Sequence, residues 1–474
     1  MQKSLLYLSI AVFLSVVGLS WLTHGSGVVR NDLGRRIFIP EQLTMPLQIK
    51  AAYNGQEIFF RYRWPTERPS LFHDILVFEG GKWIRKFGTG VGTDPYGMTE
   101  DRVAMFVDDG SVPEFARYGG YITVGDGMRF FTDQAPADAV KKHPYLGTVK
   151  KKADVRKYLP ATRLVLDDWT SVVPQDELDA LRKAGYFLDL WHWRAARSNP
   201  IGASDDEYVF EYRYGDAGKA PFSLNWDAQK QQPMFMLDRG KVGRAALLWD
   251  EIRQGKLRFD DVYYISEATA IPFDANHPWK DGDAIPRLLL HQPSGSHSDI
   301  RPSPQGARWN DGYWDVTLRR AMNTGNDVDD KQFVDRGTYT IAVAVHRNAT
   351  EGRWHYVSLP YSVGLGRSAE IVAAKFSGDS PDWNQPWTDV TLFYPGQVSW
   401  PHVNSAQHAG AANVKKGVPL KFRHSEAQLA HYGVEAEFRT EIKRQWLLTM
   451  LAGVLLILGF GTALNLLLKS KQGA

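Results

Sequence analysis

The sequence predicts a mainly β protein, built as a β-sandwich and flanked by a membrane-spanning helix at each end. Three observations lead to this fold class. Aromatic residues are frequent, with 16 Trp, 20 Tyr and 23 Phe, and 42 glycines suit tight turns between short strands. Several short runs alternate apolar and polar side chains with a period of two. Two longer runs without any charge stand near the two ends of the chain.

The composition excludes several classes of protein. The 474 residues carry 56 Lys and Arg against 53 Asp and Glu, and the basic residues form no stripe that would hold a nucleic-acid backbone. The chain has no cysteine, which rules out disulfides, zinc–thiolate sites, iron–sulfur clusters, cysteine nucleophiles and haem c attached through thioethers. Any metal or cofactor must therefore be held by His, Met, Lys, Tyr or carboxylate side chains.

The first uncharged run covers residues 5–22. At about 1.5 Å per residue it spans roughly 27 Å, just enough for the core of a bilayer. Lys3 precedes it, and no small-x-small cleavage site follows it. We therefore expect an uncleaved signal anchor within residues 1–24, and the alternative is a cleaved secretory signal.

The second uncharged run covers residues 446–468 and is followed by Lys469 and Lys471. It lacks the polar face of a helix buried in a soluble core, so we expect a transmembrane helix. The positive-inside rule then places both termini in the cytoplasm, and the export signal sends the chain between the two spans to the periplasm. The sequence thus predicts a protein of the bacterial cytoplasmic membrane with a large periplasmic domain.

Between the anchors, residues 40–366 read as one large β domain. Residues 58–64 (IFFRYRW) alternate arginines with aromatic rings, the pattern of a strand with one buried face. Regular strand-like runs separated by turn residues favour a β-sandwich. The other runs of this kind are residues 102–107, 208–214, 313–318 and 338–345.

Helical patterns are few, and the chain changes character after residue 366. We expect a short surface helix over residues 174–184 and a weaker one over 238–254, with a solvated basic loop over 141–157. The expected C-terminal parts are a small accessory region at 367–424, containing a strand at 389–394, and a helical stalk at 425–445 that opens with a capping box.

The usual catalytic patterns are absent from the sequence. It contains no Gly-x-Ser-x-Gly elbow, His-Glu-x-x-His pair, Walker loop or dinucleotide fingerprint. The glycine-rich run at residues 88–93 lacks the lysine of a phosphate loop and is interpreted as a turn. We therefore do not expect an enzyme in its own right.

Five side chains are candidates for haem iron. His192, His346 and His355 stand in strand-like runs, two of them directly beside Trp or Tyr, while Met105 lies in an apolar strand and Met128 between a turn and a strand. Imidazole and thioether groups are axial haem ligands in clefts with apolar walls. The alternative for each is a hydrogen-bonded, half-buried histidine or a methionine that fills the core.

An ordered set of segments resembles the haem-binding domain of the ethylbenzene dehydrogenase γ-subunit-like proteins, related to the haem-binding domain of cytochrome c-552 and dimethylsulfoxide-reductase-like proteins. The set spans about residues 45–366, in the order found in that family. The segments are EDRVA at 100–104, DLWHWR at 189–194, NPIG at 199–202 with Asp205 and Asp206, Gly295-Ser296 with Asp299-Ile300, WNDGYW at 309–314, TGN at 324–326 with Asp329 and Asp330, AVH at 344–346, and RWHYVSLP at 353–360.

The resemblance implies a sandwich similar to the family-nine carbohydrate-binding modules that holds one haem b through methionine and lysine and passes single electrons for a periplasmic molybdenum oxidoreductase. Some relatives look like c-type cytochromes with a Cys/Cys-His segment where this chain has residues 119–129. Gly120, Val124 and Gly125 stand in those three places here, which excludes covalent haem. No lysine matches securely.

The candidate ligands of a non-covalent haem b are thus Met128 or Met105 on one side and His192 or His355 on the other. We expect a membrane-anchored variant of the family that relays electrons between the quinone and cytochrome system, through a membrane cytochrome b or quinol-oxidising subunit, and a redox partner. A periplasmic molybdoenzyme is one candidate partner. The alternative function is a haem-free carbohydrate-binding or scaffold module of the same fold, favoured by the 16 tryptophans and the missing Cys/Cys-His segment.

Overall fold

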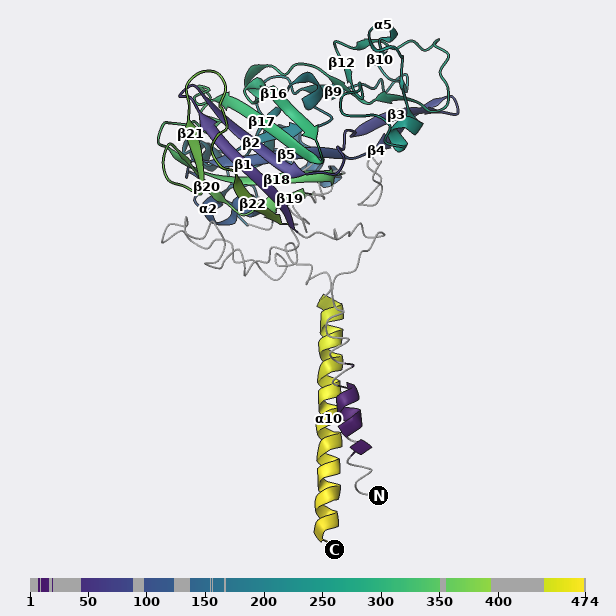
Figure 1. Ribbon diagram of the computed structural model, residues 1–474, viewed down its shortest axis with the longest axis vertical. Coiled ribbons are helices and arrows are strands. Elements are labelled where there is room, and N and C mark those ends of the chain that lie inside the picture. The colour runs from purple at the N-terminus through teal and green to yellow at the C-terminus, as the bar shows by residue number, and fades with distance from the viewer. Residues whose placement is uncertain are drawn as a thin grey trace. The chain divides into compact units, whose positions relative to one another are not determined.

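The computed structural model describes residues 7, 8, 10–16, 19, 44–87, 98–122, 137–153, 155, 157–165, 168–349, 355–393 and 439–472. The chain divides into two units, one formed by Pro40–His424 and one by Met1–Ile39 with Ser425–Ala474. The first unit consists mainly of β-strands, which confirms the predicted mainly β class (Figure 1).

The largest element is a 13-stranded sheet. Its main path runs β16-β17-β2-β1-β21-β20-β18-β5-β6-β7-β8. Two further strands lie beside this path: β19 pairs with β18, β22 pairs with β1, and the two pair with each other. The strands are β1 (Thr44–Tyr53), β2 (Glu57–Pro65), β5 (Glu100–Asp108), β6 (Leu188–Arg194), β7 (Asp205–Val209), β8 (Arg213–Gly215), β16 (Arg301–Asn310), β17 (Tyr313–Ala321), β18 (Thr338–Ala349), β19 (His355–Ser358), β20 (Tyr361–Leu365), β21 (Ile371–Lys375) and β22 (Thr388–Phe393).

The sheet folds so that distant strands face each other across one core. The ring of Trp314 on β17 lies 5.0 Å from that of Trp193 on β6, and Phe60 on β2 lies 5.4 Å from Trp191. Alternation along each strand produces this packing, because every second side chain points to the same side. These facing side chains belong to one large cluster of buried apolar residues. The finer expectation of a β-sandwich similar to family-nine carbohydrate-binding modules stays a prediction.

A lobe of three smaller sheets was not foreseen from the sequence. One sheet joins β11, β14, β3 and β4, a second joins β12, β15 and β9, and a third pairs β10 with β13. They enclose a separate apolar cluster that includes Val77, Leu247 and Ile285. The elements are β3 (Asp74–Glu79), β4 (Lys82–Phe87), β9 (Phe222–Leu224), β10 (Phe235–Leu237), α5 (Arg239–Val242), β11 (Leu247–Leu248), α6 (Trp249–Arg253), β12 (Ile265–Ser266), β13 (Ala270–Pro272), β14 (Asp283–Pro286) and β15 (Leu288–Leu290).

Most predicted elements are confirmed. The runs at 58–64, 102–107, 313–318 and 338–345 fall within β2, β5, β17 and β18, and the helix expected at 174–184 is α4 (Gln175–Lys183). The weaker helical pattern at 238–254 is divided between α5 and α6, which β11 separates.

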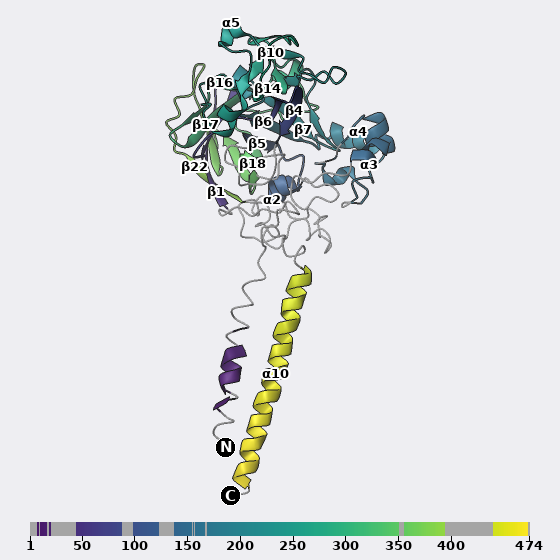
Figure 2. The same ribbon diagram turned by 90° about the vertical axis from the view of Figure 1, so that its right-hand side faces the viewer.

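Two local predictions were wrong. The run at 208–214 is a hairpin and not one strand: β7 and β8 pair antiparallel with Tyr208 opposite Tyr214, whose rings stack at 5.1 Å. The expected basic loop at 141–157 instead contains helical turns, which pack Val140 and Leu146 into a small core with Trp169. These turns are α3 (Ala137–Lys142), labelled in Figure 2, and η2 (Pro144–Val149). The glycine-rich run at 88–93 lies outside the described residues.

The region expected to form a small accessory part after residue 366 contributes two strands to the main sheet. β21 pairs in parallel with both β1 and β20, and β22 pairs antiparallel with β1. The sheet therefore continues past residue 366, because the edges of β1 and β20 offer backbone partners that sequence periodicity does not reveal. Residues 394–424 of this region lie outside the described residues.

The other unit contains α10 (Arg439–Gln472). Its segment Leu447–Gln472 is, among the described residues, the one helix long and apolar enough to cross a membrane, with 6% of its most apolar window buried. Residues 425–438 of the expected stalk lie outside the described part of the chain. At the N-terminus residues 7, 8, 10–16 and 19 are helical, and the anchor over residues 1–24 stays a prediction.

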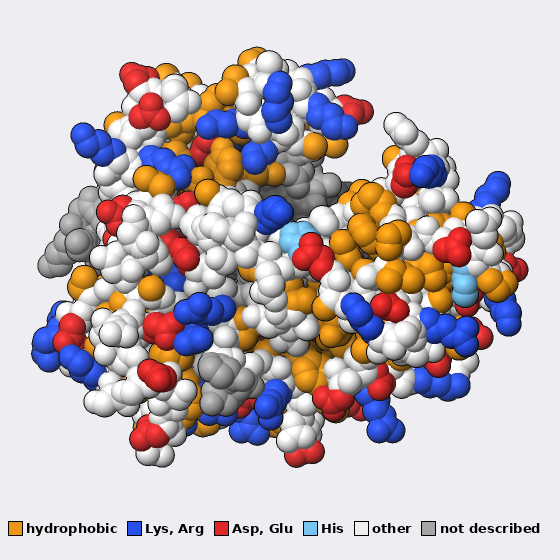
Figure 3. Space-filling model, turned by 90° about the horizontal axis from the view of Figure 1, so that it is seen from above, with side chains coloured by type: hydrophobic (Ala, Val, Ile, Leu, Met, Phe, Trp, Pro, Cys, Tyr) orange, Lys and Arg blue, Asp and Glu red, His pale blue; other side chains and the backbone are white. Residues whose placement is uncertain are grey.

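One face of the large unit is drawn in space-filling form in Figure 3. Lys and Arg side chains alternate there with Asp and Glu, and apolar side chains gather over one part of the face. No extensive field of a single sign is visible on this face.

We predict that Trp314→Ala lowers the free energy of unfolding by about 3–5 kcal/mol, because the indole packs against two other tryptophans and donates a hydrogen bond to Asp101 at 2.8 Å. Its neighbour Tyr313 is exposed, so Tyr313→Ala is the matched control and should change the free energy by less than about 1 kcal/mol. Thermal and chemical unfolding of the full chain in detergent measures both. Equal losses for the two variants would contradict the facing-sheet core.

Candidate functional site

Strand β6 presents different chemistry on its two faces. Trp191 and Trp193 belong to the apolar core, whereas His192 and Arg194 alternate with them and point to the other side of the sheet. On the neighbouring strand β5 the same alternation holds, since Met105 belongs to the core and pairs with Trp191, while Ala104 pairs with His192. We call the side of β5, β6 and β18 that bears His192 the outer face.

The sheet separates two of the predicted ligands. Met105 is 1% exposed, and its sulfur accepts a hydrogen bond from the hydroxyl of Tyr62 at 3.1 Å inside the core. His192 lies on the outer face. The structure therefore does not bring Met105 and His192 to one common site.

Of the other predicted ligands, His355 is described only by its backbone, and Met128 lies outside the described residues. The backbone of His355 opens β19 and pairs with His346 of β18, and the ring of His346 lies 6.5 Å from that of His192 with an angle of 25° between the planes. The side chain of His355 and the whole of Met128 lie outside the described residues.

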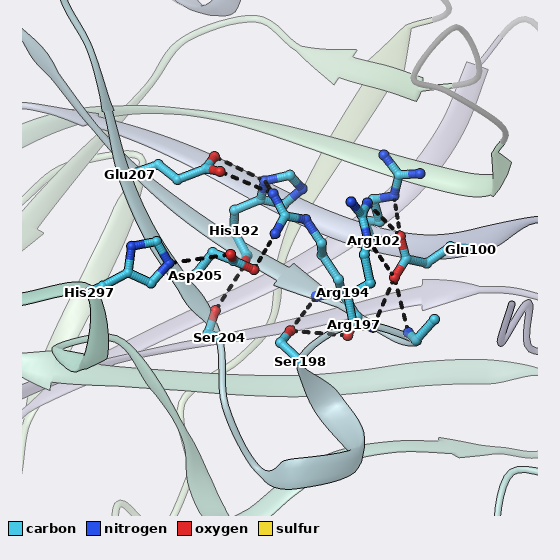
Figure 4. A network of polar contacts seen from close by, with 11 residues as sticks. Glu100, Arg102, His192, Arg194, Arg197, Ser198, Ser204, Asp205, Glu207 and His297 are labelled. Atoms are coloured by element: carbon cyan, nitrogen blue, oxygen red, sulfur yellow. Dashed lines mark hydrogen bonds and ion pairs between the residues drawn. The ribbon is translucent and has the colours of Figure 1, made fainter. Parts of the chain in front are cut away.

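A network of buried charges surrounds His192 on the outer face (Figure 4). Arg194 forms ion pairs with Asp205 and, at 3.0 Å, with Glu207, both on β7. The Nδ1 atom of His192 lies 3.2 Å from a carboxylate oxygen of Glu207 and 3.0 Å from a guanidinium nitrogen of Arg194. His297 completes this part with its Nε2 atom 3.4 Å from Asp205.

A second part of the network centres on Glu100 at the start of β5. Arg102 and Arg197 donate to its carboxylate at 2.8 and 2.7 Å, and the backbone amide of Ala196 donates at 3.1 Å. Burial alone would raise the pKa of Glu100, but the charges of Arg197 and Arg102 outweigh burial and hold the pKa well below its usual range. This carboxylate is therefore ionised in the folded protein.

Two nitrogen atoms on the outer face remain available. Burial, and then the positive charge of Arg194, lower the pKa of the His192 imidazole to about 4, so the ring is neutral near pH 7. Its Nε2 atom is buried and has no hydrogen-bond partner among the described residues, and the same is true of one terminal nitrogen of Arg102. Buried polar atoms normally have partners, so these two atoms offer places where a ligand or an ordered water can bind.

The surface beside these atoms is built from small residues. Ala104 and Ala344 face each other across β5 and β18 and are half-buried, and Ala342 follows along β18. The short helix η1 (Gly119–Ile122) packs over the far end of this strip, where a Cβ on Gly119 would lie 3.2 Å from that of Ala342. Ala104 and Ala344 thus present little side-chain bulk on this face, whereas Phe106, opposite Ala342, and η1 close its far end.

One comparison with known proteins identifies the family. The model of the family described as ethylbenzene dehydrogenase matches residues 22–358. The chain belongs to the ethylbenzene dehydrogenase family. No curated protein matches the chain. The match ends with β19, so it covers every strand of the outer face and the whole charge network, while β20 to β22 and α10 lie beyond it.

In this member of the ethylbenzene dehydrogenase family, the sequence made His192 a candidate ligand but did not point to the charged residues around it. Arg102, Arg194 and Glu207 escaped notice because a charged residue in a strand usually points to solvent. The signal was nevertheless present: Arg194 stands two positions from His192, and therefore on the same face of β6.

We predict that Glu100→Gln lowers the free energy of unfolding by about 3–5 kcal/mol, because it leaves two buried guanidinium groups without their shared carboxylate. The matched control is Glu57→Gln, since Glu57 also pairs with two arginines but in a more exposed position, and it should lose about 0–1 kcal/mol. Chemical unfolding measures the difference between the variants. A loss below 1 kcal/mol for Glu100→Gln would show that the network contributes no more than surface pairs.

Proposed function

We propose that this chain is a membrane-anchored, periplasm-facing haem b protein that relays single electrons between the quinone and cytochrome system and a redox partner. In this proposal the sheet is a two-layer sandwich, as the family resemblance implies, and the haem lies against its outer face. The observation that carries the proposal is the buried Nε2 atom of His192, which is neutral and has no partner among the described residues.

The neighbours of His192 suit a ligand of iron. A ligating histidine commonly donates its other ring N–H to a carboxylate, which fixes the tautomer and the orientation of the ring. Glu207 offers such a carboxylate oxygen 3.2 Å from Nδ1. With the proton on Nδ1, the lone pair of Nε2 is free to bind a metal.

Arg194 favours the other tautomer of His192, but its ion pairs with two carboxylates weaken this effect. Its guanidinium lies 3.0 Å from Nδ1 of His192 and would favour the proton on Nε2. The same guanidinium is engaged by two carboxylates, those of Asp205 and Glu207. We therefore assign the Nδ1–H···Glu207 arrangement to the cofactor-bound protein.

The remaining features of the outer face fit the shape and charge of haem b. In this proposal the planar ring lies against the half-buried Ala104 and Ala344, and the unpartnered nitrogen of Arg102 donates to a propionate carboxylate. When bound, haem b supplies a one-electron couple whose potential depends on axial ligands, hydrogen bonds and burial. The second axial ligand is proposed to be His355 or Met128.

The anchor and the site together suggest an electron relay fixed at the membrane. The apolar segment of α10 has the length of a span, and the family to which the chain belongs is that of an oxidoreductase. We propose a membrane cytochrome b or quinol-oxidising subunit on one side of the relay and a periplasmic redox enzyme, for example a molybdoenzyme, on the other. The chain itself carries electrons and performs no bond chemistry.

The burial of several tryptophans weakens the argument from their number for the haem-free carbohydrate-binding alternative. Trp64, Trp191, Trp193 and Trp314 are fully buried in the core and cannot stack on a sugar ring. At the surface, the indole of Trp387 is covered by cations, with Lys50 4.6 Å and Arg61 5.3 Å from the ring centroid. We therefore do not adopt this function.

We predict that the full chain purified from haem-replete cells shows a haem b spectrum in a reduced-minus-oxidised difference measurement. His192→Ala should remove or shift this spectrum, because it deletes the proposed ligand. Met105→Leu is the matched control and should leave the spectrum unchanged, since Met105 lies on the core side of the sheet. A chain without haem, or a spectrum unaffected by His192→Ala, would refute the proposed site.

We also predict that Glu207→Gln keeps the haem but raises its midpoint potential and weakens haem retention by about 10–100-fold, because a neutral amide supports the ligand less than a carboxylate does. Redox titration measures the potential. An unchanged potential would show that Glu207 does not act through His192.

A further inference from the structure

A cluster of buried carboxylates lies on the core side of the same strands, away from the outer face. We call it the acidic cluster; its members are Asp189 on β6, Asp206 on β7, Asp216 directly after β8, and Asp329 and Asp330 between β17 and β18. Oxygen atoms of Asp189, Asp206 and Asp330 lie within 4.8 Å of one another, and so do those of Asp216, Asp329 and Asp330. Asp330 therefore joins two adjacent groups of oxygen ligands.

One guanidinium group contacts this cluster. A terminal nitrogen of Arg320 lies 2.7 Å from Asp189 and 2.6 Å from Asp330, and the other terminal nitrogen donates to the backbone carbonyl of Lys331 at 2.6 Å. The amine of Lys331 points elsewhere, to Asp109 at 3.0 Å. The charge of Arg182 also acts on Asp329, so five carboxylates share two guanidinium groups, an excess of negative charge in a buried place.

Two of the carboxylates have no partner among the described residues. The side chain of Asp206 is 0% exposed, and neither of its carboxylate oxygens accepts a hydrogen bond from a described residue. Asp216 is 6% exposed, and both of its oxygens are likewise unpartnered. Burial, together with the charges of Asp330 and Asp216, raises the pKa of Asp206 well above its usual range. Such groups need either a proton or a cation, because a lone buried carboxylate is very unfavourable.

We propose that the acidic cluster binds Ca²⁺. Carboxylate oxygens are the ligands of hard cations, and Ca²⁺ takes them at about 2.3–2.6 Å, so opposite ligands can be about 5 Å apart. Oxygens that lie within 4.8 Å of one another are close enough to share one such ion, and the number of carboxylates favours the larger coordination number of Ca²⁺. Mg²⁺ requires about 2.0–2.1 Å and strict octahedral geometry, which brings opposite ligands to about 4.2 Å.

The proposed ion would tie together parts of the chain that are far apart in sequence. It would link β6, β7 and the end of β8 to the segment with Asp329 and Asp330. Strands β6 and β7 also carry His192 and Glu207 on their outer face. The ion would hold these strands without touching the haem side, so this proposal does not depend on haem binding.

The test uses the full chain in detergent, freed of metal with EGTA and dialysed against metal-free buffer. Adding CaCl₂ should restore at least one equivalent of tightly held calcium by mass spectrometry of the metal content. It should also raise the Tm by roughly 5 °C at a concentration near 100 times the Kd. Equal MgCl₂ should give a clearly smaller rise. Tb³⁺, a luminescent substitute for Ca²⁺, should be sensitised by excitation of Trp191, which lies against Arg320.

The decisive variant is Asp206→Asn, which removes one charged ligand at nearly constant shape and should weaken Ca²⁺ binding at least tenfold. Asp108→Asn is the matched control, because Asp108 is an equally buried aspartate outside the cluster, and it should keep the calcium and the rise in Tm. If Asp206→Asn does not fold, Asp329→Asn replaces it. Absence of retained calcium, a Tm insensitive to CaCl₂, or an equal effect of MgCl₂ would overturn the proposal.

Discussion

The two faces of strand β6 depend on one constraint, the burial of Trp191 and Trp193 in the core. Both indoles are fully buried and contact rings from β2 and β17, which leaves no freedom in the register of the strand. A shift of one residue would turn both indoles outward and expose them to water. Because this register is fixed, His192 and Arg194 must lie on the outer face and Asp189 on the core side.

The two faces of these strands differ in their balance of acidic and basic side chains. On the outer face Arg194 is paired with two carboxylates, and Glu100 is shared by Arg102 and Arg197, so acids and bases are close to balance. On the core side the five carboxylates of the acidic cluster outnumber the guanidinium groups of Arg320 and Arg182 that act on them. Buried ion pairs contribute little net stability compared with apolar residues, although the removal of one partner is costly.

The sequence allowed some elements to be predicted and left others hidden. Strand β2 was predictable because its arginines alternate with rings, and α4 because acids open it and Gly185 follows it. The lobe with β9 to β15 was not, since strands of two to four residues are too short to show a period. β21 was missed because its pairing with β1 joins segments more than 300 residues apart.

The candidate site was predictable only in part, because periodicity reveals a strand but not which of its faces meets the core. The run around His192 predicts a strand with aromatic residues beside the histidine, which made His192 a candidate haem ligand. The run around Met105 is just as apolar, but periodicity does not tell which face of a strand meets the core, and Met105 proved to be on the core face. The acidic cluster escaped notice because Asp206 and Asp330 come together only through the pairing of distant strands.

The central claim is that Nε2 of His192 is the atom that holds the cofactor. Pulsed electron paramagnetic resonance of the oxidised protein tests it most directly, with histidine labelled with ¹⁵N. The account predicts a ¹⁵N coupling to the low-spin iron that is lost or altered in His192→Ala. A coupling that is unchanged in this variant, or a protein without iron, would contradict the account.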